Sequence, residues 1–276
     1  MYPLVTVNLT DQKLLTVLAR NTRNASEHRQ VHQLMTENGI PYVILKGYAS
    51  ASYYGQPGLR TMGDVDFLIR EADWARATEV VTAAGFKSKP DDGGIHVAFH
   101  RAPRSTWEMH RGINGANDKV NGYLTTMIDD AHEQDGMLLP SDFHHCLVLL
   151  CHTASHLTAE GVGLRHLCDW AVFARKVDVG RWEDQLTDCG MYRFAQVLSL
   201  VSVKYLKLPY QTWMGEAEDA LTDSLMDDIL DGGNFGSKDA DRTRQIKYIS
   251  NRDEHTVDGK STIRQAWHTV GRKAKA

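Results

Sequence analysis

The chain has 276 residues, of which 42% are hydrophobic and 24% charged, an ordinary composition for a globular protein that argues against a disordered chain. Its formal net charge of −4 argues against a protein that coats nucleic acid with its whole surface. The apolar run at residues 147–151 is far shorter than the about 20 residues that cross a bilayer. No basic segment followed by a long apolar run opens the sequence. We therefore expect a cytoplasmic protein with no membrane segment, and its four cysteines, which form no CxxC pair, to be reduced thiols.

The first part of the chain alternates between helical and strand-like patterns. Apolar residues at helical spacing in residues 11–38 indicate one interrupted helix or two short helices, ending at Gly39. The β-rich run at 41–46 predicts a buried strand, which is followed by a short helix at 48–54. The elements expected next are a strand at 64–69, a helix at 73–84 with Asp73 as N-cap and Gly85 at its end, and strands at 95–100 and 106–113.

From about residue 118 onward the pattern is helical throughout, with helices expected at 141–157, 163–176, 181–188 and 192–206. The sequence thus predicts an α+β fold in which a small mixed β-sheet with flanking helices is followed by a helical bundle region. The expected domains are a catalytic α/β domain at 1–140, a helical domain at 141–236 and a polar basic tail at 237–276. That tail has a net charge of +5 and the rest of the chain −9, so we expect a partly disordered segment or a basic arm.

A pair of carboxylates opens the second predicted strand, in the sequence Gly63-Asp64-Val65-Asp66-Phe67-Leu68-Ile69. Because strand side chains alternate between faces, Asp64 and Asp66 are expected on one face, about 6–7 Å apart. Glu108 and His110 share one face of the strand at 106–113. A sheet that sets the two strands side by side would bring three carboxylates together, and that number can hold the two Mg²⁺ ions used in phosphoryl and nucleotidyl transfer. The alternative interpretation of the Asp pair is a strand-to-turn cap or a solvated strand edge.

A phosphate-binding turn is expected just before the carboxylates. Lys46 and Gly47 follow the first strand and open a short helix. The glycine lets a phosphate approach the backbone, and a helix N-terminus favours anions. Lys46 could place an ammonium on a triphosphate, and Arg60 could add a bidentate contact.

These motifs resemble the uncharacterised nucleotidyltransferase family of the DNA polymerase β-like superfamily, over roughly residues 11–236. The resemblance rests on an ordered series of motifs, namely Leu45-Lys46-Gly47, Arg60-Thr-Met-Gly-Asp64-Val-Asp66, Gly85-Phe86, Glu108-Met-His110, Cys151-His152 through His156, and Leu164-Arg165 through Asp169-Trp170.

The resemblance implies a polymerase β-like nucleotidyltransferase fold and Mg²⁺-dependent transfer of a nucleoside monophosphate from an NTP. By position, Asp64 and Asp66 would be metal ligands and Glu108 the third acid, nearest the acceptor hydroxyl. The turn Lys46-Gly47-Tyr48 departs from the superfamily's Gly-Ser or Gly-Gly turn, so the phosphate contacts are expected to come from the lysine and the backbone.

The predicted helix at 141–157 is rich in histidine. His145, His152 and His156 share one helical face, and Arg165 and Asp169 are four residues apart on the next helix. Three interpretations stay open: hydrogen bonds between helices, a cleft in which His152, His156 and Arg165 contact nucleotide or acceptor, and a metal-dependent phosphohydrolase site built from His145, His152, His156 and Asp169.

The function expected from the sequence is transfer of an NMP from an NTP to an acceptor hydroxyl, with release of pyrophosphate. Asp64, Asp66 and Glu108 would be the catalytic and metal-binding residues, and Lys46, Gly47 and Arg60 would bind the nucleotide. Mg²⁺ is the expected cofactor, with Mn²⁺ as a substitute. The acceptor could be RNA, a protein or a small molecule, and His110, His152, His156, Arg165 and Asp169 are candidate contacts to it. The alternatives are the His/Asp phosphohydrolase and a non-catalytic nucleotide-binding module.

Overall fold

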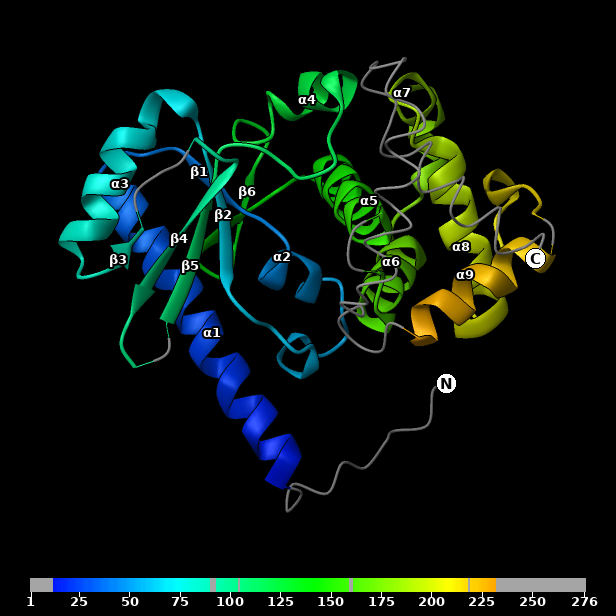
Figure 1. The fold of residues 1–276 in the computed structure, drawn as a ribbon, viewed down its shortest axis with the longest axis horizontal. Helices are drawn as coiled ribbons and strands as arrows, with labels where there is room; N and C mark the ends of the chain where they lie inside the picture. Colours follow the sequence, from blue (N-terminus) through cyan, green and yellow to red (C-terminus); the bar gives the residue numbers. More distant parts are fainter. Residues whose placement is uncertain (1–11, 90–92, 104, 159–160, 218, 232–276) are drawn as a thin grey trace. The chain divides into compact units, whose positions relative to one another are not determined.

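The computed structural model describes residues 12–89, 93–103, 105–158, 161–217 and 219–231 (Figure 1). The chain forms two compact units, and we treat each by itself. The first, Met1–Arg111 with Ala131–Leu139, is here called the sheet unit; the second, Gly112–Asp130 with Pro140–Ala276, is called the helical unit. As functional domains, the ranges 1–140 and 141–236 stay predictions, and the expected basic tail at 237–276 lies outside the described residues.

The sheet unit is built on a five-stranded sheet in the order β1-β2-β5-β4-β3. Strands β2 and β5 are parallel, and the other neighbouring pairs are antiparallel. The sheet is therefore mixed, which confirms the predicted fold class. Its strands are β1 (Tyr42–Ile44), β2 (Val65–Ile69), β3 (Lys87–Ser88), β4 (His96–Arg101) and β5 (Ser105–His110). Its helices are α1 (Gln12–Glu37), α2 (Gly47–Ala51) and α3 (Trp74–Ala83), with short 3₁₀ turns η1 (Pro57–Leu59) and η2 (Glu71–Asp73).

One face of this sheet forms the core. Alternate residues of the central strands, among them Val65 and Phe67 of β2 and Trp107 and Met109 of β5, are buried there together with apolar residues of α1 and α3. Between the parallel strands β2 and β5 the chain passes through α3, β3 and β4. Parallel strands need a long crossover connection of this kind. Asp73 precedes α3 as expected, but its side chain makes no capping hydrogen bond.

The expected break in the first helix is wrong, because α1 is one continuous helix of 26 residues. Apolar Val31 and Met35 are buried in its second half, whereas the same face carries buried Asn21, Asn24 and His28 further back. Spacings of three and four residues keep all five on one stripe. The stripe is polar in the middle because these side chains bind backbone groups. The apolar periodicity is therefore interrupted although the helix is continuous.

The expectation of helix alone after residue 118 is also wrong. A hairpin of β6 (His132–Gln134) and β7 (Met137–Leu139) turns at Asp135 and Gly136, which both have positive φ, +54° and +73°. Asp-Gly is a strong signal for such a tight turn. Met137 and Leu139 join the core of the sheet unit, and the Tyr42 hydroxyl accepts a hydrogen bond from the Leu138 backbone at 3.2 Å. Two strands of three residues are too short to show a clear alternation.

The helical unit confirms the helices predicted in the second half of the chain. Trp170 and Phe173 of α6 are both buried, and the Trp170 indole donates a hydrogen bond to Ser199 at 3.0 Å. The four cysteines are free thiols, as predicted. The helices of this unit are α4 (Asp118–Leu124), α5 (Asp142–Thr158), α6 (Leu164–Lys176), α7 (Glu183–Asp188), α8 (Tyr192–Leu206) and α9 (Asp219–Asp231), with 3₁₀ turns η3 (Val179–Trp182) and η4 (Thr212–Met214).

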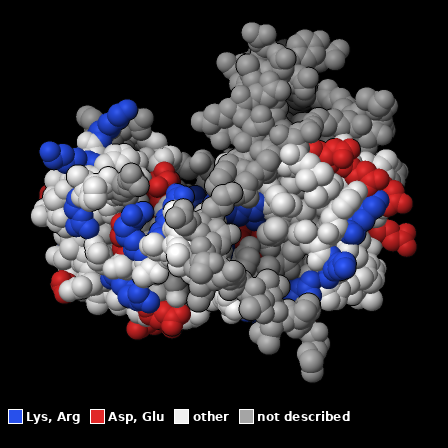
Figure 2. All heavy atoms as spheres, turned by 90° about the horizontal axis from the view of Figure 1, so that it is seen from below, with Lys and Arg blue, Asp and Glu red and all other residues white. Residues whose placement is uncertain are grey.

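Two properties of the described surface bear on function. None of the helices in the described ranges is both long and apolar enough to cross a membrane. On the face shown in Figure 2, Lys and Arg side chains form small groups, and Asp and Glu side chains form others. Positive groups are thus present at the surface of a chain whose net charge is negative.

Candidate active site

The parallel pairing of β2 and β5 brings the predicted acids together. In this register Asp66 lies opposite Glu108, and Leu68 lies opposite His110. These residues occupy the face of the sheet away from the α1 and α3 core, because Phe67 between them points into that core. Asp64 lies just before β2 and is exposed, and its placement on the same face as Asp66 stays a prediction.

Asp66, Glu108 and His110 form a compact cluster. The His110 Nε2 donates to Asp66 Oδ1 at 3.0 Å and lies 3.6 Å from Glu108 Oε2. One nitrogen or oxygen atom from each of the three residues lies within 4.8 Å of the others. The His110 and Asp66 side chains are 6% and 11% exposed, whereas Glu108 is 26% exposed. Glu108 is therefore the member of the cluster that a solute reaches most easily.

Lys46 completes the polar cluster from the neighbouring strand end. Its Nζ lies 2.8 Å from Asp66 Oδ1. The Leu45 amide donates to the Asp66 carbonyl at 2.8 Å, which holds the end of β1 beside β2. Lys46 and Gly47 both have a φ of +36°. That conformation is costly for lysine, and residues kept in such regions are concentrated at functional sites. In this backbone conformation the Lys46 ammonium reaches the Asp66 carboxylate.

Arg60 supports this turn from beneath. It is buried, and its Nη1 donates to the Gly47 carbonyl at 3.0 Å. The contact fixes the peptide between Gly47 and Tyr48, one residue after Lys46, so Arg60 has a positioning role in this structure. A direct contact between Arg60 and a triphosphate stays a prediction.

Sequence reasoning missed three residues of α1 that lie beside the site, and two of them hold the segment before the acids. The Asn21 amide group donates to Gly58 and Arg60 carbonyls at 2.7 and 2.8 Å, and its oxygen accepts from the Met62 amide at 3.1 Å. Asn24 donates to the Gly63 carbonyl, immediately before Asp64.

The third of these residues is His28, whose Nδ1 bonds the Asn24 carbonyl at 2.8 Å. A Cβ added to Gly47 would lie 3.3 Å from His28 Nε2, so glycine permits this close approach. The available signal was the spacing of Asn21, Asn24 and His28, which puts three polar groups on the buried stripe of one helix.

The cluster is strongly coupled by charge. Burial alone would raise the pKa of Asp66, but the Lys46 charge and the hydrogen bond from His110 hold it well below its usual range. Burial likewise opposes protonation of His110, yet the bonds to Asp66 and Glu108 raise its pKa overall. The pKa of Asp64 is raised by partial desolvation and then by the charges of Glu108 and Asp66. All three carboxylates therefore lie within electrostatic reach of one another.

These residues fit a divalent cation. Carboxylate oxygens are the donors that Mg²⁺ prefers, and an added imidazole is compatible with Mn²⁺. Desolvation is the main cause of the raised pKa of Asp64, and the charges of Glu108 and Asp66 add a repulsion that a bound cation would relieve. Lys46 supplies part of the compensating positive charge in this structure, and His110 adds to it when protonated.

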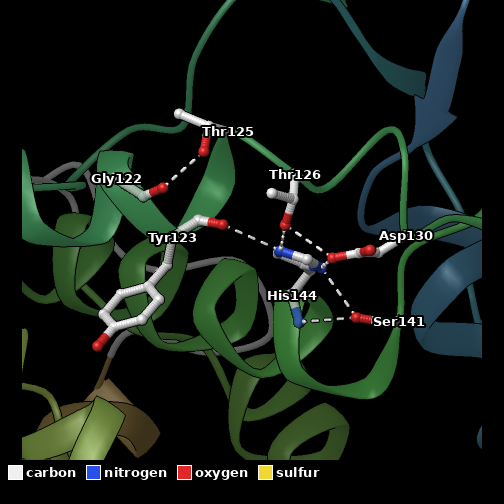
Figure 3. A network of polar contacts seen from close by, with 7 residues as sticks. All are labelled: Gly122, Tyr123, Thr125, Thr126, Asp130, Ser141 and His144. Atoms are coloured by element: carbon white, nitrogen blue, oxygen red, sulfur yellow. Dashed lines mark hydrogen bonds and ion pairs between the residues drawn. The ribbon is translucent and has the colours of Figure 1, made fainter.

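The histidines of the helical unit fall into separate environments. His144 Nε2 donates to the Tyr123 carbonyl at 3.0 Å, and its Nδ1 lies 2.8 Å from the Ser141 hydroxyl. Figure 3 shows how Thr126 and Asp130 complete this network. These contacts join the segment that follows α4 to the start of α5, which is a structural role. His145 is buried and packs edge-on against Phe173.

The two remaining histidines of α5 meet a histidine of α6. His152 and His156 are half-buried, and both lie against the ring of His166. This third partner was not among the candidates from the sequence. Arg165 and Asp169 lie on α6 beside it, and burial, then the charges of His156 and Arg165, lower the pKa of His166 to about 4. The set expected for a phosphohydrolase included His145 and Asp169, whereas the compact group contains His166 in their place. Contacts of His152, His156, Arg165 and Asp169 with an acceptor stay predictions.

Comparison with known protein families adds a decisive observation. Residues 4–206 match the model of a family described as uncharacterised nucleotidyltransferase. The chain belongs to the uncharacterised nucleotidyltransferase family. No curated protein is significantly similar to it.

Membership confirms the resemblance seen in the sequence motifs. The match of the uncharacterised nucleotidyltransferase family covers the whole five-stranded sheet, α1 to α8, and every residue of the cluster around Asp66. Nucleotidyl transfer is accordingly the general chemistry to which this chain belongs.

Proposed function

We propose that the protein transfers a nucleoside monophosphate from an NTP to an acceptor hydroxyl in a Mg²⁺-dependent reaction. The observation that carries the proposal is the convergence of Asp66, Glu108 and His110 within 4.8 Å, next to the ammonium of Lys46 at 2.8 Å from Asp66. Paired acids beside a lysine match a site that must hold a cation and a triphosphate together.

Asp64, Asp66 and Glu108 would hold Mg²⁺, with Mn²⁺ as a substitute. When bound, the ion supplies neutralisation of the triphosphate charge. Lys46 would bind a phosphate oxygen, and the backbone of Gly47, fixed by Arg60, would lie against the triphosphate. Such preorganised positive groups stabilise charge as it develops during transfer.

Glu108 would accept the proton of the acceptor hydroxyl, because it is the more exposed acid and Asp66 is already bonded to Lys46 and His110. The hydroxyl oxygen then forms a bond to the α-phosphorus, and the bond from that phosphorus to the bridging oxygen breaks. Pyrophosphate leaves with the electron pair of the broken bond. RNA, a protein and a small molecule all offer a suitable hydroxyl.

Labelled nucleotides test this proposal. The protein is incubated with Mg²⁺ and α- or γ-labelled NTP, together with total RNA, cell extract or small hydroxyl compounds. We expect the α-label to be transferred to the acceptor and the γ-label to be released as pyrophosphate. Neither reaction should occur in Asp66→Asn or Glu108→Gln. Glu79→Gln is the matched control, because Glu79 is exposed on α3.

The same experiment separates the alternatives. Release of phosphate that survives Asp66→Asn but not His152→Ala would contradict nucleotidyl transfer and indicate a phosphohydrolase. NTP binding by calorimetry without transfer to any acceptor class would indicate a nucleotide-binding module. No NTP binding in the presence of Mg²⁺ would exclude the proposed site.

A further inference from the structure

A cluster of three histidines lies in the helical unit, formed by the end of α5 and the start of α6. His152 and His156 are one helical turn apart, so they present their rings on the same side of α5. His166 is the third residue of α6. The ring centroids are separated by 4.4 Å for His152 and His156, 5.1 Å for His152 and His166, and 4.7 Å for His156 and His166. A ring nitrogen from each residue lies within 4.8 Å of the other two.

His166 is held in a defined orientation. It is buried, and its Nδ1 lies 3.2 Å from the Gly163 amide and 3.3 Å from the Gly163 carbonyl. A histidine that ligates a metal commonly donates its other ring N–H to a backbone carbonyl. Nδ1 would donate to the Gly163 carbonyl in the tautomer that leaves Nε2 unprotonated, whereas in the other tautomer it accepts from the Gly163 amide. The opposite nitrogen, Nε2, is buried and has no hydrogen-bond partner in the described part of the chain.

We propose that His152, His156 and His166 form a Zn²⁺ site that is separate from the acidic cluster of the sheet unit. Three imidazoles without a carboxylate suit a borderline-soft ion such as Zn²⁺ and not Mg²⁺, which prefers oxygen donors. Two histidines four residues apart on one helix are a recurrent way of holding zinc.

The present spacing requires a small adjustment. Ligand atoms lie within 4.8 Å of one another, and nitrogens around a tetrahedral Zn²⁺ lie about 3.3 Å apart, from bond lengths of about 2.0–2.1 Å. Binding would require the half-buried His152 and His156 side chains to turn toward His166, which is bonded at Gly163.

Neighbouring charges bear on the fourth ligand. Arg165 and Asp169 both act on His166, with opposite sign. The aspartate favours a cation and the arginine opposes it. Three protein ligands leave a fourth position for water or an anion, as in zinc sites with chemical function. An anion there would also neutralise the charge of Arg165.

Metal stoichiometry tests the site independently of nucleotidyl transfer. Full-length protein carrying Asp66→Asn and Glu108→Gln, which weakens the acidic cluster as a competing site, is stripped with a chelator. It is then titrated with Zn²⁺ against a chromophoric chelator. We expect a site with a Kd below about 1 μM that is lost in His152→Gln and in His166→Gln, together with a rise in Tm on zinc addition that both variants lack. The control His132→Gln removes an exposed histidine of β6 in the sheet unit and should leave stoichiometry unchanged.

Three outcomes would overturn the proposal. They are no zinc binding near that affinity, equal binding in the parent and both cluster variants, and an equal loss in His132→Gln. Circular dichroism checks folding, and the half-buried His152 gives a variant that does not depend on replacing the buried His166. A spectrum of the Co²⁺-substituted protein that loses its visible bands in His152→Gln would support imidazole ligation directly.

Discussion

Lys46 combines a charge, a strained backbone and a place beside the acids. Its ammonium neutralises Asp66 at 2.8 Å, and its φ of +36° is one that lysine adopts only under constraint. A residue kept in this conformation despite the cost points to a role for its side chain.

We expect Lys46→Met to lower kcat/KM for nucleotidyl transfer by about a hundredfold, because a preorganised charge near the triphosphate is removed. Lys46→Arg should retain more of the activity, since the charge is kept. Steady-state kinetics with α-labelled NTP provide the measurement. Lys87→Met, at an exposed position of β3, is the matched control, and equal activity of the two methionine variants would contradict the role of Lys46.

Asp64 offers the opposite combination, a group that costs stability in the ligand-free protein. Glu108 and Asp66 repel its charge. Asp64→Asn should therefore abolish transfer while raising Tm slightly, by roughly 1 °C, because the side chain is exposed and solvent screens most of the repulsion. Calorimetry without metal and the label assay test both halves of this prediction. A clear fall in Tm would show that Asp64 stabilises the fold.

At the scale of elements, the turn between β1 and α2 depends on contact with α1. Gly47→Ala would place a Cβ 3.3 Å from His28 Nε2, at a φ of +36°. We expect a loss of about 1–2 kcal/mol in the free energy of unfolding and weaker nucleotide binding.

Gly55→Ala is the matched control for this prediction, since a Cβ there meets nothing within 4 Å. Urea denaturation of both variants gives the comparison. If the two behave alike, the turn adjusts freely and the proposed constraint on Lys46 is absent.

The elements were predictable from the sequence where local pattern sufficed. Strong apolar periodicity indicated α5, α6 and α8, and alternation indicated β2 and β5. The continuity of α1 was missed because Asn21, Asn24 and His28 occupy its buried stripe. The hairpin of β6 and β7 was missed because its strands have three residues each.

The candidate site was predictable in composition but not in register. From the sequence, Asp66 was predicted to share a strand face with Asp64, and Glu108 to share a strand face with His110. Their position opposite each other depends on the parallel pairing of β2 with β5, which no local pattern determines. The contacts of Arg60 and His28 with Gly47 likewise arise only when α1 and the segment before β2 come together.

At the scale of the whole molecule, a buried neutral histidine links folding to pH. Burial, the largest cause, lowers the pKa of His28 to about 4 from its ordinary value of 6.5. In the unfolded chain His28 is protonated below about pH 6.5, whereas in the folded chain it is protonated only below about pH 4. His28 therefore does not reduce the free energy of unfolding above pH 6.5, and it reduces it progressively as the pH falls from 6.5 toward 4.

The loss in the free energy of unfolding that His28 causes at low pH would be up to about 3 kcal/mol. Urea denaturation at pH 7 and pH 4.5 should show a smaller loss of stability in His28→Gln than in the parent protein. His132→Gln, at an exposed position, should lose as much as the parent. Identical losses in all three proteins would rule out His28 as the source.

The ion pair between Lys46 and Asp66 has a thermodynamic consequence. If Asp66 holds the metal as proposed, a free metal ion would have to compete with an ammonium that already occupies the carboxylate, whereas a nucleotide would offer that ammonium a phosphate and so release Asp66. Affinities for cation and nucleotide are then reciprocally linked, each ligand raising the affinity for the other. In the ligand-free protein the Lys46 ammonium thus competes with the metal for Asp66, and we expect metal and NTP to bind cooperatively.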